Sequence, residues 1–184
     1  LRGRLRAVKN RIEKRLDDLD RWKDAFLGAL SATSPERLAF RADGVGWNAL
    51  DVVQHLVLVE EGVLAYARKK LLAPPQPISI VDRGKLALLV GVLRSPIRVR
   101  APVAQVVPSE TLPLETSATR WDQSRRDLRT LLLGLPEERR AALFFRHPAA
   151  GGLDPAGTLI FLHEHARHHE AQVRRIGRAP GAPG

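Results

Sequence analysis

The chain has 184 residues, of which 44% are hydrophobic and only 5% aromatic, and it carries a formal net charge of +10. This length suits one domain with a single core, and the scarcity of aromatic residues favours a helical core of Leu, Val and Ala over a β-sandwich. Cysteine is absent, which excludes disulfides, a thiolate nucleophile and a thiolate metal ligand supplied by the chain itself.

The first predicted element is an amphipathic helix over residues 5–30. Its apolar residues recur at three- and four-residue steps, and charged residues cover the opposite face. A second helix is expected over residues 48–72. Asn48 suits its N-cap, and Asp51 at the third helical position completes a capping box.

The stretch over residues 76–113 is the least regular part of the sequence. Residues 82–93 could form a short apolar helix, whereas residues 95–113 contain four prolines and predict an extended or looped crossover. Such a long connection lets the helices before and after it run parallel. The apolar run at residues 86–93 suits either a homodimer contact or an intramolecular lid, and the sequence leaves both open.

A third long helix is expected over residues 115–133, where an apolar stripe recurs at helical spacing. After it, residues 137–143 could form another short helical turn. Residues 147–153 are rich in Gly, Ala and Pro, which is typical of a loop.

The last predicted helix spans residues 155–176, with Asp154 as its N-cap, proline at its first position and Gly177 at its end. We therefore predict an all-α fold, a four-helix bundle with a long crossover between helices 2 and 3. It would form a single domain over residues 1–177, followed by a flexible C-terminal tail at residues 178–184.

Three histidines, His55, His165 and His169, are the strongest candidates for a functional site. His165 and His169 lie four apart and share one helix face, and His169 falls within the apolar seam. A polar residue in that seam costs on the order of 1–3 kcal/mol unless it finds partners. If the second helix brings His55 alongside, three neutral imidazoles converge, as in catalytic metal sites with a vacant position. A hydrogen-bonded polar cluster is the alternative.

The remaining histidines are weaker candidates. His163 lies off the shared face and suits a position beside the ligands or at the surface. His168 could replace a ligand, but by spacing it leaves the seam. His147 precedes a proline in the expected loop and could line the mouth of a pocket.

Two well-known motifs are absent from the sequence. His163, Glu164 and His165 are followed by Ala166 and Arg167, so the His-Glu-x-x-His motif of zinc proteases is broken. Phosphate-binding glycine motifs are also missing, because no strand is expected before the Gly-Gly pair at residues 151–152 and no lysine follows it.

Three stretches of the sequence resemble the DinB/YfiT-like superfamily. They are Gly46-Trp47-Asn48 before Gln54-His55-Leu56, then Arg146-His147-Pro148 with Gly152-Leu153, and finally His165-Ala-Arg-His168-His169-Glu-Ala-Gln172. The resemblance covers roughly residues 5–176. It implies a four-helix bundle with a long crossover and a metal triad on His55, His165 and His169.

The resemblance implies more than one function. Some relatives transfer low-molecular-weight thiols, such as bacillithiol or mycothiol, onto electrophiles, and others are known only as products of DNA-damage or stress induction. In this chain, which has no cysteine, the thiol would be a separate cosubstrate. A divalent ion would stabilise its thiolate, which then attacks a small-molecule substrate. Three imidazoles accept Zn, Ni or Fe, and Cu as well, and the affinity order does not choose among them.

We therefore expect a metal-dependent transferase that uses a low-molecular-weight thiol, with Arg146 and Arg167 as candidates to hold the thiol's carboxylates. A metal-dependent hydrolase is the first alternative, in which Glu60 or Glu164 could orient a water molecule or an imidazole. The second is a basic binding protein with structural histidines. Nucleic-acid binding is not favoured, because the arginines are spread over every segment and form no compact block.

The sequence also predicts a cytoplasmic protein without a membrane segment. Its longest apolar run is far shorter than the roughly 20 residues that span a bilayer. The first residues are basic, but no apolar signal core follows them.

Overall fold

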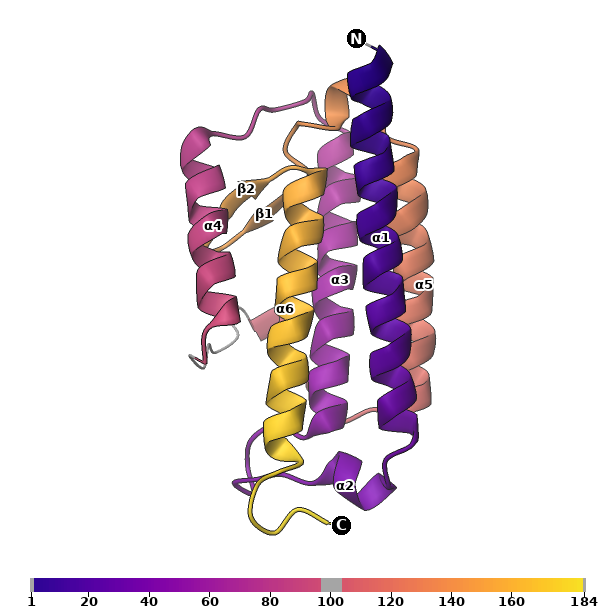
Figure 1. The fold of residues 1–184 in the computed structure, drawn as a ribbon, viewed down its shortest axis with the longest axis vertical. Coiled ribbons are helices and arrows are strands. Elements are labelled where there is room, and N and C mark those ends of the chain that lie inside the picture. Colours follow the sequence, from indigo (N-terminus) through magenta and orange to yellow (C-terminus); the bar gives the residue numbers. More distant parts are fainter. Residues whose placement is uncertain (1, 97–103, 184) are drawn as a thin grey trace.

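The computed structural model describes residues 2–96 and 104–183, and their side chains from residue 10 onward. Four long helices lie side by side along the molecule (Figure 1). They are α1 (Arg2–Ser31), α3 (Ala49–Leu71), α5 (Leu114–Leu133) and α6 (Pro155–Ile176). Both α3 and α6 contact other long helices, α3 with α5 and α6, and α6 with α1 and α3. Apart from one small hairpin, the predicted all-α class is confirmed.

Local sequence signals account for the start of the helices that carry the site. At α3, the Asn48 side chain accepts a hydrogen bond from the Asp51 backbone at 2.8 Å, and Asp51 returns the interaction at 3.1 Å. At α6, the Asp154 carboxylate accepts from the Gly157 backbone at 2.7 Å, and proline occupies the first helical turn. These caps satisfy backbone N–H groups that have no partner within the helix, and so they fix where each helix begins.

The connection between α3 and α5 contains a further helix, α4 (Ile80–Arg94), which packs against α6. In Figure 1, α3 and α5 run in the same direction, and α4 runs the opposite way at the edge of the molecule, beside the hairpin and α6. Within the predicted extended or looped crossover over residues 95–113, the described residues include one short 3-10 helix at Ala104–Val106. Residues 97–103 of that stretch lie outside the described residues.

The expected loop at residues 147–153 is wrong except at residues 148–150, which form a turn. Strand β1 (Phe145–His147) pairs with β2 (Gly151–Leu153) in an antiparallel hairpin. Each strand has three residues, which is too short to show an alternating pattern in the sequence. Gly151 has a φ of +71°, and a Cβ there would clash with the Asp82 carboxylate of α4. The hairpin therefore needs glycine at this position and is held against α4.

The core consists of aliphatic side chains between the long helices, with Trp121 and Phe144 as its largest buried aromatic residues. No helix within the described ranges has the length and hydropathy to cross a bilayer. In the C-terminal tail, Arg37 donates hydrogen bonds to the carbonyl oxygens of Gly177 at 2.9 Å and Pro183 at 2.8 Å. The flexibility expected for this tail, like the single domain, stays a prediction.

Candidate metal centre

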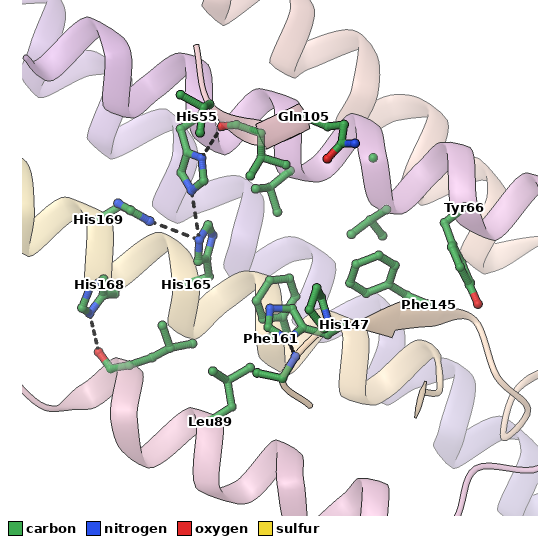
Figure 2. Close-up of a pocket in the computed structure, with 18 of the residues that line it drawn as sticks. His55, Tyr66, Leu89, Gln105, Phe145, His147, Phe161, His165, His168 and His169 are labelled. Atoms are coloured by element: carbon green, nitrogen blue, oxygen red, sulfur yellow. Dashed lines mark hydrogen bonds between the residues drawn. The ribbon is translucent and has the colours of Figure 1, made fainter. Parts of the chain in front are cut away.

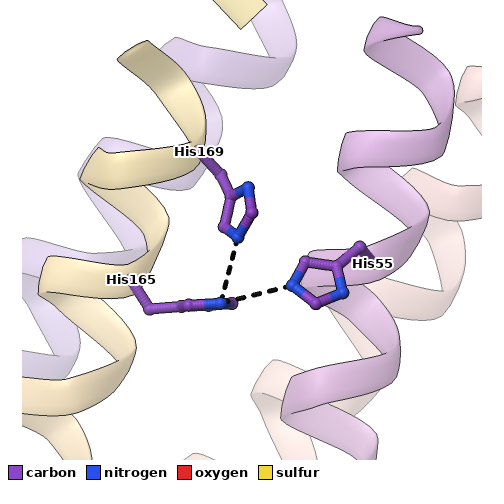
Figure 3. Close-up of side chains that lie close together, drawn as sticks. All are labelled: His55, His165 and His169. Carbon is purple, nitrogen blue, oxygen red and sulfur yellow. Dashed lines mark hydrogen bonds between the residues drawn. The ribbon is translucent and has the colours of Figure 1, made fainter. Parts of the chain in front are cut away.

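The imidazoles of His55, His165 and His169 converge between α3 and α6 (Figure 3). The Nε2 atom of His165 lies 3.2 Å from Nε2 of His55 and 3.1 Å from Nε2 of His169. One nitrogen from each ring falls within 4.8 Å of the other two. Nitrogen ligands about 2.0–2.1 Å from a tetrahedral ion lie about 3.4 Å apart, so the observed spacing fits one shared ion.

Hydrogen bonds on the far side of two rings fix which nitrogen carries the proton. Nδ1 of His55 lies 2.6 Å from the carbonyl oxygen of Val106, and a carbonyl only accepts. Nδ1 of His169 likewise lies 2.7 Å from Oε1 of Gln172. Both Nδ1 atoms therefore carry a proton, which leaves the lone pairs of both Nε2 atoms directed toward the centre. Metal-binding histidines are usually held by such outer hydrogen bonds.

Burial keeps the three imidazoles neutral. It is the largest cause that lowers the pKa of His55, although the bond to Val106 opposes it. Burial also lowers the pKa of His169 to about 3. For His165, burial and the neighbouring His169 and His55 lower the pKa well below its usual value. Neutral imidazole is the form that binds a metal ion.

A cavity of about 800 Å³ adjoins the three histidines. Its wall is formed by α3, α4, α6, the hairpin and the 3-10 helix, and most of the lining side chains are apolar. In Figure 2 the three histidines lie at one end and Tyr66 at the other. The apolar residues that line it include Val59, Val63, Leu89, Leu93, Phe145 and Phe161. A mainly apolar cavity of this volume is typical of a small-molecule binding site.

The other histidines are divided between the cavity and the surface. His147 lines the cavity, as expected, although it does so from β1 rather than from a loop. The expectation that His168 leaves the buried seam is wrong. It is 8% exposed, and its Nδ1 donates to the carbonyl of Leu93 at 2.9 Å, because α4 packs over that face. His163 is partly exposed and lies 3.4 Å from the Glu164 carboxylate.

Both candidate carboxylates are occupied by arginines, and no described interaction joins either of them to the three imidazoles. Glu60 accepts hydrogen bonds from Arg125 at 2.8 and 2.6 Å and from Trp121 at 3.0 Å. Glu164 accepts from Arg94 at 2.9 and 2.6 Å. The expectation that one of them orients an imidazole is therefore not met for His55, His165 or His169 in this structure.

The two candidate arginines differ in position. Arg146 is exposed and lines the cavity. Arg167 is exposed as well, but it is not among the residues that line the cavity. Of these two arginines, only Arg146 belongs to the residues that line the cavity.

Three residues around the imidazoles were not identified as site residues from the sequence. Gln172 follows His169 by three positions on α6, and this spacing could have indicated their contact. Trp47 was named only within the Gly46-Trp47-Asn48 motif, yet its ring centre lies 4.8 Å from that of His55. Val106 contributes a backbone carbonyl, for which a sequence offers no side-chain signal.

Comparisons with known proteins identify the family. A family model described as the DinB superfamily matches residues 4–173. This range includes all three histidines, and it supports the resemblance stated from the sequence motifs. Comparisons with curated proteins and with solved structures found no match.

Proposed function

Since the chain belongs to the DinB superfamily, we propose that it is a metal-dependent enzyme that holds one divalent ion on His55, His165 and His169. Members of this superfamily typically bind a metal. The observation that carries the proposal is the convergence of three Nε2 atoms beside a cavity of about 800 Å³. We also infer that α1, α3, α5 and α6 form the four-helix bundle, with α4 in its crossover.

The reaction that we propose joins a low-molecular-weight thiol to an electrophilic small molecule. A bond forms between the thiol sulfur and an electrophilic carbon, while the thiol proton and the leaving group depart. When bound, the divalent ion would supply the positive charge that stabilises the thiolate. The thiol is a separate cosubstrate, because the chain has no cysteine.

The residues around the centre support thiol transfer over hydrolysis. Glu60 and Glu164, which could have oriented a water molecule, are engaged by Arg125 and Arg94. The cavity wall is mainly apolar, which suits an organic molecule, and the positive charge of Arg146 at this cavity would hold a carboxylate of the thiol. These features favour a reaction between two bound organic molecules.

The apolar run at residues 86–93 supports the lid rather than the dimer contact. Leu86 and Leu89 pack against the core, and Leu93 is buried. Leu88 is 71% exposed, so it is the residue of this run that a homodimer contact would use. We infer that α4 covers the cavity within one chain, and that a homodimer is not required for the site.

The decisive experiment combines metal analysis with thiol consumption. Freshly purified protein should contain about one Zn, Ni or Fe per chain, and a variant with all three histidines replaced by alanine should contain none. Thiol consumption should then be measured against a panel of electrophiles, such as 1-chloro-2,4-dinitrobenzene. His169→Ala should abolish it, and His163→Ala should retain it, because His163 lies outside the triad.

Other results of the same experiment would replace the proposal. Cleavage of esters or amides without added thiol would indicate the hydrolase. DNA binding that depends on salt but not on chelator would indicate the basic binding protein. Protein without metal, and without affinity for added metal, would rule out both enzyme hypotheses.

A further inference from the structure

His147 lies in the cavity wall, outside the metal triad. It comes from strand β1, and its ring centre is 4.6 Å from that of Phe161. Its position in the hairpin is set by pairing with Gly151. Since neither α3 nor α6 carries this side chain, it can contact a molecule in the cavity from a different direction than the triad does.

The hairpin turn determines which ring nitrogen of His147 carries the proton. Its Nδ1 lies 3.1 Å from the backbone nitrogen of Ala149 and 3.2 Å from that of Ala150. A backbone N–H only donates, so Nδ1 accepts and carries no proton. Burial lowers the pKa of His147 to about 4, which keeps the ring neutral at physiological pH. A neutral ring with a bare Nδ1 carries its proton on Nε2.

The Nε2–H group of His147 is left available to the cavity. It lies on the side of the ring away from Ala149 and Ala150, and within the described part of the chain it has no hydrogen-bond partner. Its nitrogen is not fully buried, so the group is accessible from the cavity. The group can only donate, so its partner must be an acceptor.

We propose that the cavity binds a mainly apolar molecule that carries a carbonyl oxygen, and that the Nε2–H of His147 donates a hydrogen bond to this oxygen. The apolar wall selects the body of the molecule, while a fixed donor in such a wall selects the position of its acceptor. One part of this inference rests on the proposed function, namely that the bound molecule is the electrophile of the reaction. Binding itself does not require the metal.

The test compares two probes of nearly equal shape, benzophenone and diphenylmethane, which differ by the carbonyl oxygen. Their dissociation constants are measured by equilibrium dialysis against the full chain at pH 7.5, with chelator present so that a failure of metal binding does not affect the result. Two variants distinguish the role of Nδ1 of His147 from the role of Nε2. His147→Asn keeps an acceptor for the turn amides but is too short to place a donor at Nε2. His147→Gln places a donor there.

We expect both probes to bind the wild-type protein. His147→Asn should weaken benzophenone binding about tenfold, because the carbonyl oxygen loses its donor, and should change diphenylmethane binding less than twofold. His147→Gln should retain most of the benzophenone affinity. Equal weakening of both probes, unchanged benzophenone binding in His147→Asn, or no binding of either probe would overturn the proposal. Diphenylmethane binding that is unchanged within twofold also shows that the His147→Asn variant is folded, whether or not the protein binds a metal.

Discussion

Glu60 of α3 and Arg125 of α5 form an ion pair inside the helical core. Their side chains are 2% and 5% exposed, and Arg125 donates to the carboxylate from Nε at 2.8 Å and Nη2 at 2.6 Å. Trp121 donates to the same carboxylate at 3.0 Å, and Arg125 also reaches Asp20 of α1 at 3.0 Å. These contacts join α1, α3 and α5, so the ion pair stabilises the core.

This contact predicts the effect of Glu60→Gln. The substitution leaves Arg125 buried without its main counter-ion, which should lower the free energy of unfolding by about 3 kcal/mol. Metal affinity should change less than twofold, since Glu60 makes no described contact with the triad. Urea denaturation and competition with a chromophoric chelator measure the two quantities.

The neighbouring carboxylate provides a matched control. Glu61 pairs with Arg120, and their side chains are 36% and 37% exposed, so Glu61→Gln should cost less than about 1 kcal/mol. A Glu60→Gln protein of normal stability but with weakened metal binding would contradict this assignment. Glu60 would then act on the metal site.

Addition of a divalent metal should stabilise the protein. A ligand that binds only the folded state contributes about 2.7 kcal/mol at a hundredfold excess over its dissociation constant. For a domain of this size, the melting temperature should rise by roughly 5–10 °C between chelator and added Zn or Ni. Differential scanning calorimetry measures the shift. His163→Ala should retain it and His165→Ala should lose it, and an unchanged melting temperature in the wild type would count against the site.

Gln172 should contribute to metal affinity without contacting the ion. Its Oε1 accepts the Nδ1 proton of His169 at 2.7 Å, which orients the ring. Gln172→Leu should therefore weaken metal binding about 10–100-fold, while Gln172→Glu, which keeps an acceptor, should retain it. Gln123→Leu, an exposed change on α5, is the matched control in the chelator competition. If Gln172→Leu and Gln172→Glu weaken binding equally, the hydrogen bond to His169 has no role.

The sequence was sufficient where a single helix carries the information. The helix expected over residues 155–176 has the observed bounds, because its cap, its proline and its apolar spacing all lie within one local segment. The same spacing placed His165 and His169 on one face. Local signals also started α3 at the residue after Asn48, which fixed the position of His55 along that helix.

The features that the sequence did not reveal depend on contacts between distant segments. The hairpin strands are too short for a periodic signal, and their pairing is fixed by packing against α4. Glu60 and Arg125 look like ordinary surface charges until α3 and α5 are placed together. The bond from His55 to the Val106 carbonyl uses a backbone atom, which every residue has, so no residue type indicates it.

The metal-free protein should become less stable in mild acid, because burial opposes protonation of the triad in the folded state but not in the unfolded state. Burial lowers the pKa of His169 to about 3, whereas the ordinary value for histidine is 6.5. Between these values, the unfolded state binds a proton that the folded state does not, so the free energy of unfolding decreases as the pH falls. For this one group, the loss between pH 7.5 and pH 5.5 is on the order of 1 kcal/mol.

Replacing the titrating ring isolates its contribution. In His169→Asn, the difference in unfolding free energy between pH 7.5 and pH 5.5 should be smaller than in the wild type by about 1 kcal/mol. Urea denaturation with chelator present measures both differences, and only their comparison matters, because the substitution also changes stability at every pH. A variant that loses stability as steeply as the wild type would show that His169 already takes up its proton in the folded protein over this range. The ring would then be solvated rather than held dry between Trp47 and the other two imidazoles.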